Sequence, residues 1–191
     1  MADAAGSVGA GATTVRLYHG SNVTIEQPDV SFNTGFADLG KGFYLTDDHG
    51  AAQRRAASRA RRTGEGTATV SVFDLDEACV PWVMWGAESP ALPSGAPEGP
   101  FGLCFESSPA GIVAWANYIK ACRRGATEVP GLGAPAIVRA WIATEEVEMV
   151  CSGMVPAEEL AEFMDPAELI VQYCLLDQDV IARALTFVRA E

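Results

Sequence analysis

The chain has 191 residues, of which 49% are hydrophobic and 20% are charged, so its composition is that of a folded globular domain. The formal net charge of -12 excludes binding to nucleic acid through the overall electrostatic field, and such binding would need a local basic patch. Five scattered cysteines without a CxxC pair and only two histidines argue against a metal site and against a disulfide framework.

The N-terminal segment 1–12 consists of small residues and is expected to be flexible, and it lacks the basic and apolar regions of a signal peptide. No apolar run is long enough to span a bilayer, so we expect no membrane association. Together with unpaired cysteines, this predicts a cytoplasmic protein. Residues 13–191 are expected to form a single domain.

In chain order, β-forming residues that stop at glycine predict a strand over 13–20. A polar loop over 21–41 leads to a short strand over 42–46. Thr46 and the two aspartates that follow it offer N-caps for a helix that ends near Arg62. Glycines directly after this helix supply its stop.

An alternating segment over 67–75 predicts a strand, 80–85 is either a strand or a buried turn, and 86–102 is a loop dense in glycine and proline. Helices and strands interleave too irregularly for a parallel βαβ sheet, so we expect an α+β domain with two packed sheets. The remaining elements are expected as a helix at 109–124, a loop at 125–135, strands at 136–143 and 146–151, a helix at 156–164, a strand at 169–176, a helix at 177–185 and a last strand.

One segment with unusual chemistry is Tyr-His-Gly-Ser at 18–21, at the end of the first expected strand. Gly20 has no Cβ, so a ligand can approach its main chain closely. His19 beside it can donate a hydrogen bond to a hydroxyl. Taken alone, the segment is also explained as a strand that stops at a turn.

The second segment is Gly-Lys-Gly at 40–42, which precedes a short strand. Alternation along this strand places Phe43 and Leu45 on one face and Tyr44 on the other. A tyrosine that faces away from the core beside two glycines can stack on a heterocycle, a contact of about 1–3 kcal/mol. On its own, this segment too is explained as an ordinary turn before a strand.

Together the two segments, HGS at 19–21 and GKGFY at 40–44, resemble the first two motifs of the ADP-ribosyltransferase superfamily, in the branch of diphtheria toxin and the poly(ADP-ribose) polymerases. The longer pattern LYHGS…PDV…DLGKGFYLTDD is closer still to a bacterial family of unknown function related to these transferases. The C-terminal part of that family resembles the segment VQYCLLDQDVIARALTF at 171–187. The resemblance is sharp over 17–57 and moderate over 169–188. It implies a split β-sandwich, with two small sheets around an NAD cleft and flanking helices.

The resemblance implies that NAD is the substrate, without a metal, and that His19, Tyr44 and Gln172 form the catalytic set. His19 would bind a ribose hydroxyl, Tyr44 would stack on the nicotinamide ring, and Gln172 would take the position of the third motif. Gly20 would hold the nicotinamide carboxamide through its main chain. The other implied cofactor-binding residues are Ser21 on the adenosine side, Gly42 beside the stacking tyrosine, and Arg55 as a second stacking residue.

The sequence departs from the family pattern at three positions. Gln172 is an amide where most active transferases have glutamate, so it can bind a hydroxyl but cannot act as a base or carry charge. Val171 replaces an aspartate, and Arg55 replaces an aromatic residue. Strand alternation makes Gln172 half-buried, so its amide needs either a main-chain partner or a ligand, and both alternatives stay open.

Glu146 and Glu148 are a second candidate pair of acids. Two apart on an expected strand, they would share one face, as the Glu-x-Glu pair of other transferase branches does. The alternative interpretation is a solvated strand face.

The run 54–62 holds five of the thirteen basic residues. On a helix, it places Arg55, Arg59 and Arg62 on one face. The run is either a solvated helix end, with cations near the C-terminus, or a patch for NAD phosphates or a polyanionic target.

The sequence therefore predicts an NAD-dependent mono-ADP-ribosyltransferase that modifies an unknown protein or nucleic-acid acceptor and releases nicotinamide. Three alternatives stay open. With water as acceptor the protein would be an NAD glycohydrolase. It would otherwise be a non-catalytic module that binds NAD or a partner, or a scaffold in which the motifs are coincidental.

Overall fold

The computed structural model describes residues 14–32, 37–86 and 97–191. The expected flexible segment 1–12 lies outside these residues. Parts of the expected loops at 21–41 and 86–102 also lie outside them.

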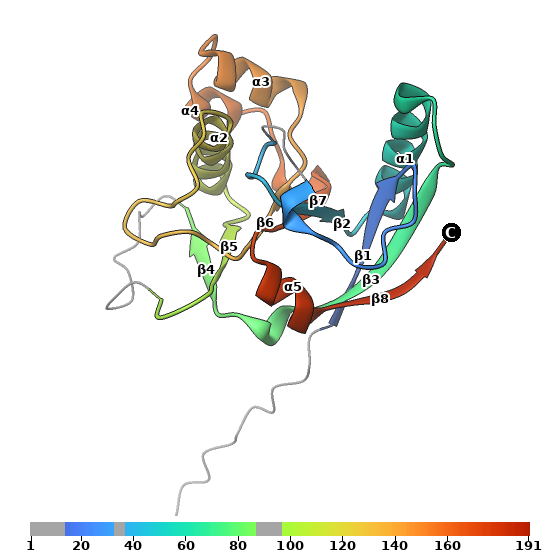
Figure 1. Cartoon of the computed structure of the whole chain (residues 1–191). Helices are drawn as coiled ribbons and strands as arrows, with labels where there is room; N and C mark the ends of the chain where they lie inside the picture. Colours follow the sequence, from blue (N-terminus) through green and yellow to red (C-terminus); the bar gives the residue numbers. More distant parts are fainter. Residues whose placement is uncertain (1–13, 33–36, 87–96) are drawn as a thin grey trace, which may run out of the picture.

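One hydrogen-bonded sheet holds eight strands among these residues, in the order β4-β5-β6-β7-β2-β1-β3-β8 (Figure 1). The strands are β1 (Thr14–Ser21), β2 (Phe43–Thr46), β3 (Thr69–Asp76), β4 (Trp82–Trp85), β5 (Gly102–Phe105), β6 (Ile137–Trp141), β7 (Val171–Leu175) and β8 (Leu185–Ala190). The helices are α1 (His49–Thr63), α2 (Pro109–Arg123), α3 (Glu145–Ser152), α4 (Ala157–Leu160) and α5 (Gln178–Ala184), with 3-10 turns η1 (Val30–Phe32), η2 (Glu77–Cys79) and η3 (Pro166–Glu168).

The mixed α+β class is confirmed, but the expected pair of packed sheets is replaced by a single continuous sheet. The pairing between the central strands β1 and β2 is short, because these strands are in register only at Tyr18 and Thr46. β1 and β3, in contrast, are in register along all of β1. β4, β5 and β6 run parallel, so part of the sheet is a βαβ arrangement that the sequence analysis had excluded. The crossover is possible because α2 is long enough to return the chain to the start of β6.

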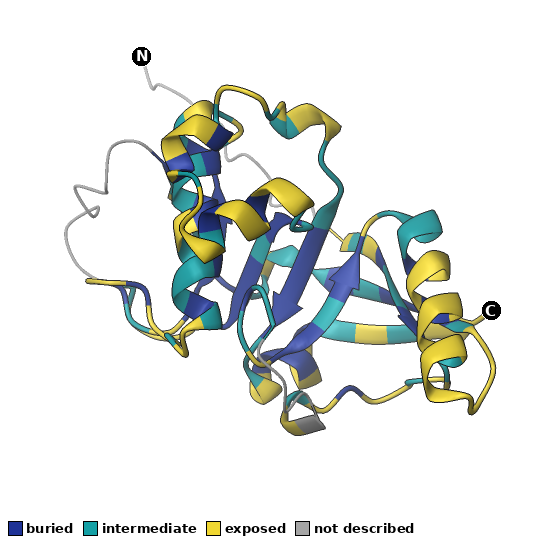
Figure 2. Ribbon diagram, turned by 90° about the horizontal axis from the view of Figure 1, so that it is seen from above, coloured by how far each residue is buried: buried dark blue, intermediate teal, exposed yellow. Residues whose placement is uncertain are grey.

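Two main clusters of buried apolar side chains lie on the two faces of the sheet. The first is covered by α2, α3 and α4 and contains Trp115 and Trp141, whose rings meet edge to face. The second contains Phe73 and Leu175 and is closed by α5. Figure 2 shows the buried central strands of the sheet, helices with both buried and exposed residues on one side, and the largely exposed α1 at the end of the sheet near the C-terminus. The second cluster includes residues of β3 as well as of β7, so it runs across the pairing of β1 with β2.

Helix α1 begins and ends as its sequence predicts. Asp48 is the N-cap and accepts a hydrogen bond from the main-chain N–H of Ala51. Gly64 ends the helix in the left-handed region with φ 67°, a conformation that glycine adopts without steric cost. The buried side of the helix consists of Ala52 and Ala56, whose small side chains let it lie close to β1.

The expected strand at 146–151 is wrong, because this segment forms helix α3. Three acidic residues lie in its first turn, where their negative charges stabilise the positive end of the helix dipole. Gly153 ends the helix with φ 80°. Glu146 and Glu148 are two positions apart on a helix, so they point to different sides rather than sharing a face. No helix within the described ranges combines the length and the apolar character needed to cross a membrane.

Candidate functional site

His19 lies at the point where β1 and β2 separate. Its Nδ1 is 2.7 Å from the main-chain oxygen of Tyr44, and because a carbonyl only accepts, Nδ1 carries the proton. The ring stacks on Phe43, with 4.5 Å between the centroids. Burial, and to a smaller extent the charges of Arg55 and Arg59, lower the pKa of His19 to about 4. At neutral pH the ring is therefore uncharged and its Nε2 is a hydrogen-bond acceptor, so the expectation that His19 donates to a hydroxyl is wrong for this tautomer.

The main chain of Gly20 points toward the same place. Gly20 is opposite Val70 on β3, and Val70 exchanges both of its main-chain hydrogen bonds with Glu191 on the far side of β3. The pair of Gly20 and Val70 is thus a non-hydrogen-bonded pair, so the N–H and C=O of Gly20 point away from β3 and toward β2. There, the register between the strands is limited to Tyr18 and Thr46. We call this place, where β1 continues past its register with β2, the β1–β2 split.

Both expected cofactor-binding glycines also have a packing requirement. A Cβ on Gly20 would overlap the main chain of α1 at Ala52 O and Ala56 N. A Cβ on Gly42 would overlap the main-chain oxygen of Leu175 on β7. Glycine at these positions is therefore explained by close approach of the backbone, whatever else the two residues do.

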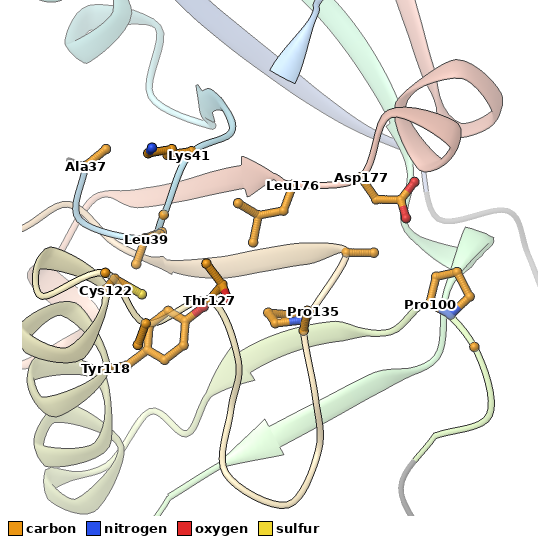
Figure 3. Close-up of a pocket in the computed structure, with 16 residues that line it drawn as sticks. Ala37, Leu39, Lys41, Pro100, Tyr118, Cys122, Thr127, Pro135, Leu176 and Asp177 are labelled. Carbon is orange, nitrogen blue, oxygen red and sulfur yellow. The ribbon is translucent and has the colours of Figure 1, made fainter. Parts of the chain in front are cut away.

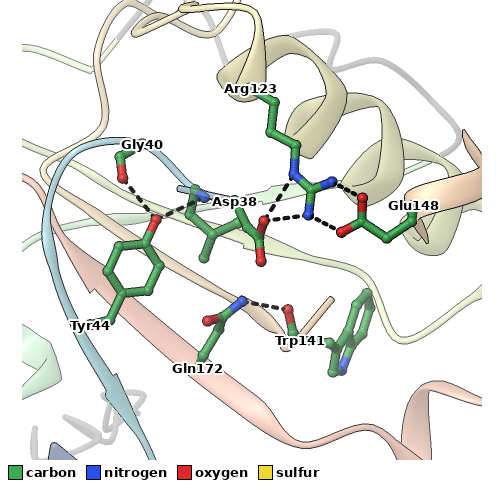
Figure 4. A network of polar contacts seen from close by, with 8 residues as sticks. Asp38, Gly40, Tyr44, Arg123, Trp141, Glu148 and Gln172 are labelled. Carbon is green, nitrogen blue, oxygen red and sulfur yellow. Dashed lines mark hydrogen bonds and ion pairs between the residues drawn. The ribbon is translucent and has the colours of Figure 1, made fainter. Parts of the chain in front are cut away.

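Tyr44 lies on the opposite face of β2 from Phe43 and packs against the cluster under α2. Its hydroxyl accepts a hydrogen bond from Leu39 N at 2.9 Å and donates one to Gly40 O at 2.8 Å (Figure 4). Burial raises the pKa of Tyr44 far above its ordinary value, so the hydroxyl stays protonated. The ring thus anchors the Gly-Lys-Gly segment from one end, and it is only partly exposed.

Gln172 and Tyr44 share one face of neighbouring strands, because Thr46 is in register with Gln172 and Tyr44 with Cys174. Gln172 is 8% exposed, and its Nε2 donates to Trp141 O at 2.8 Å (Figure 4). Of the two alternatives, the structure shows the main-chain partner. Among the described residues, no donor is bonded to the amide oxygen Oε1. This oxygen is also not one of the fully buried polar atoms without a partner, so it is in contact with solvent. Oε1 is therefore an available acceptor.

The three expected catalytic residues are close in the sheet but do not share a face. His19 stacks on Phe43, and Phe43 alternates with Tyr44 along β2. The ring of His19 thus lies toward the face opposite Tyr44 and Gln172. Its contact with Tyr44 is at the strand edge, through the main-chain oxygen.

The remaining expected residues lie on either side of the split. Ser21 ends β1 and is 5% exposed, with its hydroxyl 3.5 Å from the side-chain oxygen of Asn22. Arg55 is exposed on α1 and acts on His19 through its charge. Stacking of Arg55 on a ligand stays a prediction.

A cavity of about 600 Å³ lies apart from the split (Figure 3). It is lined by the segment 37–41, by Tyr118 and Cys122 of α2, by the loop that follows α2, and by the end of β7 with Asp177. It includes the Gly-Lys part of the second motif, but none of the three expected catalytic residues lines it. Its wall is mostly apolar, and Lys41 is the cation at its rim.

Asp47 is a candidate that the sequence analysis did not single out beyond helix capping. It follows β2 directly and lines a recess of about 330 Å³ with Asp48, Glu168 and Val171. Burial raises the pKa of the Asp47 carboxyl above its ordinary value. The signal in the sequence was two aspartates after a short strand. With three carboxylates around it, this recess repels a phosphate group.

Glu148 belongs to a structural ion-pair network rather than to a pair of acids. Arg123 at the end of α2 contacts Asp38 at 2.6 Å and both carboxylate oxygens of Glu148 at 2.6 and 2.7 Å (Figure 4). The hydrogen bonds from Arg123 lower the pKa of Glu148. The network ties the segment before β2 to α2 and α3, which helps to hold the second motif in place.

Comparison with known proteins gives one match. Residues 15–83 match a protein family described as "Protein of unknown function (DUF3990)". This range contains His19, Gly20, Tyr44 and α1, and it ends before Gln172. No curated protein and no solved structure matches the chain. The match thus covers the β1–β2 split and carries no activity with it.

Proposed function

We propose that the chain binds NAD at the β1–β2 split and transfers its ADP-ribose to an acceptor, with release of nicotinamide. The observation that carries the proposal is the main chain of Gly20, which faces the split with both its N–H and its C=O. A carboxamide has one acceptor oxygen and an NH₂ donor, so these two main-chain groups complement the carboxamide of nicotinamide. The motif resemblance independently assigns Gly20 that contact.

Groups on both faces of the sheet offer contacts to such a ligand, which would have to pass through the split to reach them all. The neutral His19 presents Nε2 as an acceptor, and each ribose hydroxyl is a donor. Oε1 of Gln172 is an acceptor on the face that also carries Tyr44, so a second hydroxyl would bind there. The exposed part of the Tyr44 ring would stack on the nicotinamide ring.

The transfer breaks the bond between the nicotinamide nitrogen and C1′ of the ribose. The bonding electrons leave with nicotinamide, which changes from a cationic pyridinium to a neutral molecule. The acceptor oxygen, nitrogen or other nucleophile forms the new bond at C1′ and gives its proton to solvent. The transition state resembles an oxocarbenium ion. Gln172 contributes by orienting the ribose, because an amide supplies no negative charge. With water as acceptor, the same step is NAD hydrolysis.

A second candidate function is a non-catalytic module that binds NAD without turnover. The observation in its favour is position 172, where an amide is fixed to Trp141 O by a hydrogen bond. A glutamate at this position stabilises the cationic transition state electrostatically, and the glutamine does not. The cavity beside Lys41 gives such a module a further place for a ligand or a partner.

Incubation with NAD, with nicotinamide measured over time, separates the two functions. We expect the wild-type chain to release nicotinamide, Gln172→Ala to be slower, and Gln172→Glu to equal or exceed the wild type, by up to about 10²-fold. The melting temperature of each variant is measured alongside. Gln172→Glu brings a carboxylate oxygen toward Trp141 O, so we expect it to be destabilised by about 1–3 kcal/mol.

Saturable NAD binding without nicotinamide release would support the module and contradict transfer. If the wild type neither binds NAD nor releases nicotinamide, and both variants only lose stability, then Gln172 is a structural glutamine and the proposed function is wrong.

A further inference from the structure

Helix α1 presents three arginines, Arg55, Arg59 and Arg62, along one flank beside β1, and the charges of the first two act on His19. Ala52 and Ala56 face β1, since their main-chain atoms are those that a Cβ on Gly20 would overlap. With 100° between successive residues, Arg55 and Arg59 lie on the same flank next to this buried stripe. Arg61 points to the opposite flank of the helix.

Arg55 and Arg59 have no carboxylate partner among the described residues, although the chain carries 25 acidic residues. Five other arginines do reach a carboxylate, namely Arg16, Arg54, Arg123, Arg139 and Arg189, whereas the remaining described arginines, Arg61 among them, do not. Arg55 and Arg59 are exposed and one helical turn apart, and like charges at this spacing repel each other. A bound anion would relieve that repulsion.

Their place in the fold is next to the β1–β2 split. α1 touches β1 at Gly20, whose main chain faces the split, and the charges of Arg55 and Arg59 both act on His19. A ligand whose carboxamide meets Gly20 and whose ribose meets His19 would have its next groups close to this flank. In a dinucleotide, the group after the nicotinamide ribose is a diphosphate.

We infer that Arg55 and Arg59 form a diphosphate subsite for the dinucleotide. The inference rests on the proposed binding of NAD at the split. Two guanidinium groups match the two negative charges of a diphosphate, and each can donate a forked pair of hydrogen bonds to phosphate oxygens. This assigns Arg55 to the phosphates, in place of the stacking position that the family resemblance implied.

The test is calorimetry with three probes, NAD, ADP-ribose and nicotinamide riboside, on the wild type and on Arg55→Gln, Arg59→Gln and Arg61→Gln. We expect Arg55→Gln and Arg59→Gln each to weaken NAD and ADP-ribose about tenfold and to leave the riboside unchanged, because the riboside has no phosphate. Arg61→Gln removes the same charge from the same helix and serves as the matched control, with affinities expected to equal those of the wild type. Raising the salt concentration should weaken ADP-ribose more in the wild type than in the variants.

Equal affinity of all variants for NAD would overturn the subsite while leaving NAD binding intact. The same holds if Arg61→Gln loses as much affinity as Arg59→Gln, since the effect would then be a general loss of positive charge. If the wild type binds none of the three probes, the proposed function and the subsite are both wrong.

Discussion

At the scale of single residues, His19 decides what the split can recognise. A histidine at a strand end is ordinarily ready to change its charge near neutral pH. Here the ring is held against Phe43 and its Nδ1–H is bound to Tyr44 O, so its remaining nitrogen is an acceptor over the whole physiological range. The sequence identified the residue. It did not identify the tautomer, because the carbonyl partner is 25 positions away and is set by the register of β1 and β2.

The depressed pKa of His19 makes stability depend on pH. The unfolded chain takes up a proton near pH 6.5 and the folded chain near pH 4, so between these values the unfolded state binds more protons. The contribution of the neutral His19 to the free energy of unfolding should therefore be complete above pH 6.5. It should fall by up to about 3 kcal/mol as the pH drops to 4. Urea denaturation at pH 7.5 and 4.5 measures this change.

His19→Asn is the control for this pH dependence, because the asparagine amide can still donate to Tyr44 O but does not titrate. The difference between the wild type and the variant should shrink as the pH is lowered. Identical pH profiles for the two proteins would contradict the assignment of a buried, neutral His19.

Gln172 shows the limit of sequence reasoning at this scale. Alternation along the strand correctly placed it in a buried position, and the cost of an unpaired amide required a partner. Which partner it has depends on β6, because Trp141 is in register with the start of β7. That pairing joins residues 31 positions apart, and no local pattern contains it.

At the scale of elements, the contact between α1 and β1 fixes the geometry of the split. The N-cap at Asp48 and the glycine stop were readable from the sequence because they are local signals. The close approach of the helix to Gly20 was not, since it depends on two alanines that a propensity argument treats only as good helix formers. Elements with weak local signals were misjudged. β5 is a short apolar run without alternation, directly after the expected loop, and α3 has the valines of a strand, although its acidic first turn favours a helix.

Substitution of Gly20 tests this contact. In Gly20→Ala the added Cβ would overlap the main chain of α1, which cannot move without displacing the helix, so we expect a loss of about 3 kcal/mol in the free energy of unfolding. Gly50→Ala, within α1 itself, is the matched control. Its Cβ would meet only the ends of the Arg54 and Asp48 side chains, so helix propensity should make the change neutral or stabilising. Equal losses for the two variants, measured by urea denaturation, would contradict the close packing of α1 at Gly20.

At the scale of the whole molecule, the sheet is continuous, and its two apolar clusters lie on opposite faces. The second cluster runs across the short pairing of β1 with β2. The sequence predicted the α+β class, because that prediction rests on local patterns. It could not predict one sheet in place of two, since that depends on the order of strands from distant parts of the chain. Nor could it predict the Arg123 network, which joins residues 85 positions apart and steadies the second motif.

Hydrogen–deuterium exchange with and without saturating NAD tests the central claim most directly, because it reports where the ligand lies. Binding at the β1–β2 split predicts slower exchange in peptides that cover 17–22 and 43–46, with no change in the 125–135 loop beside the cavity. Slower exchange confined to that loop and the end of α2 would place the ligand in the cavity instead. That result, or no change anywhere in the chain, would contradict the β1–β2 split as the site of NAD.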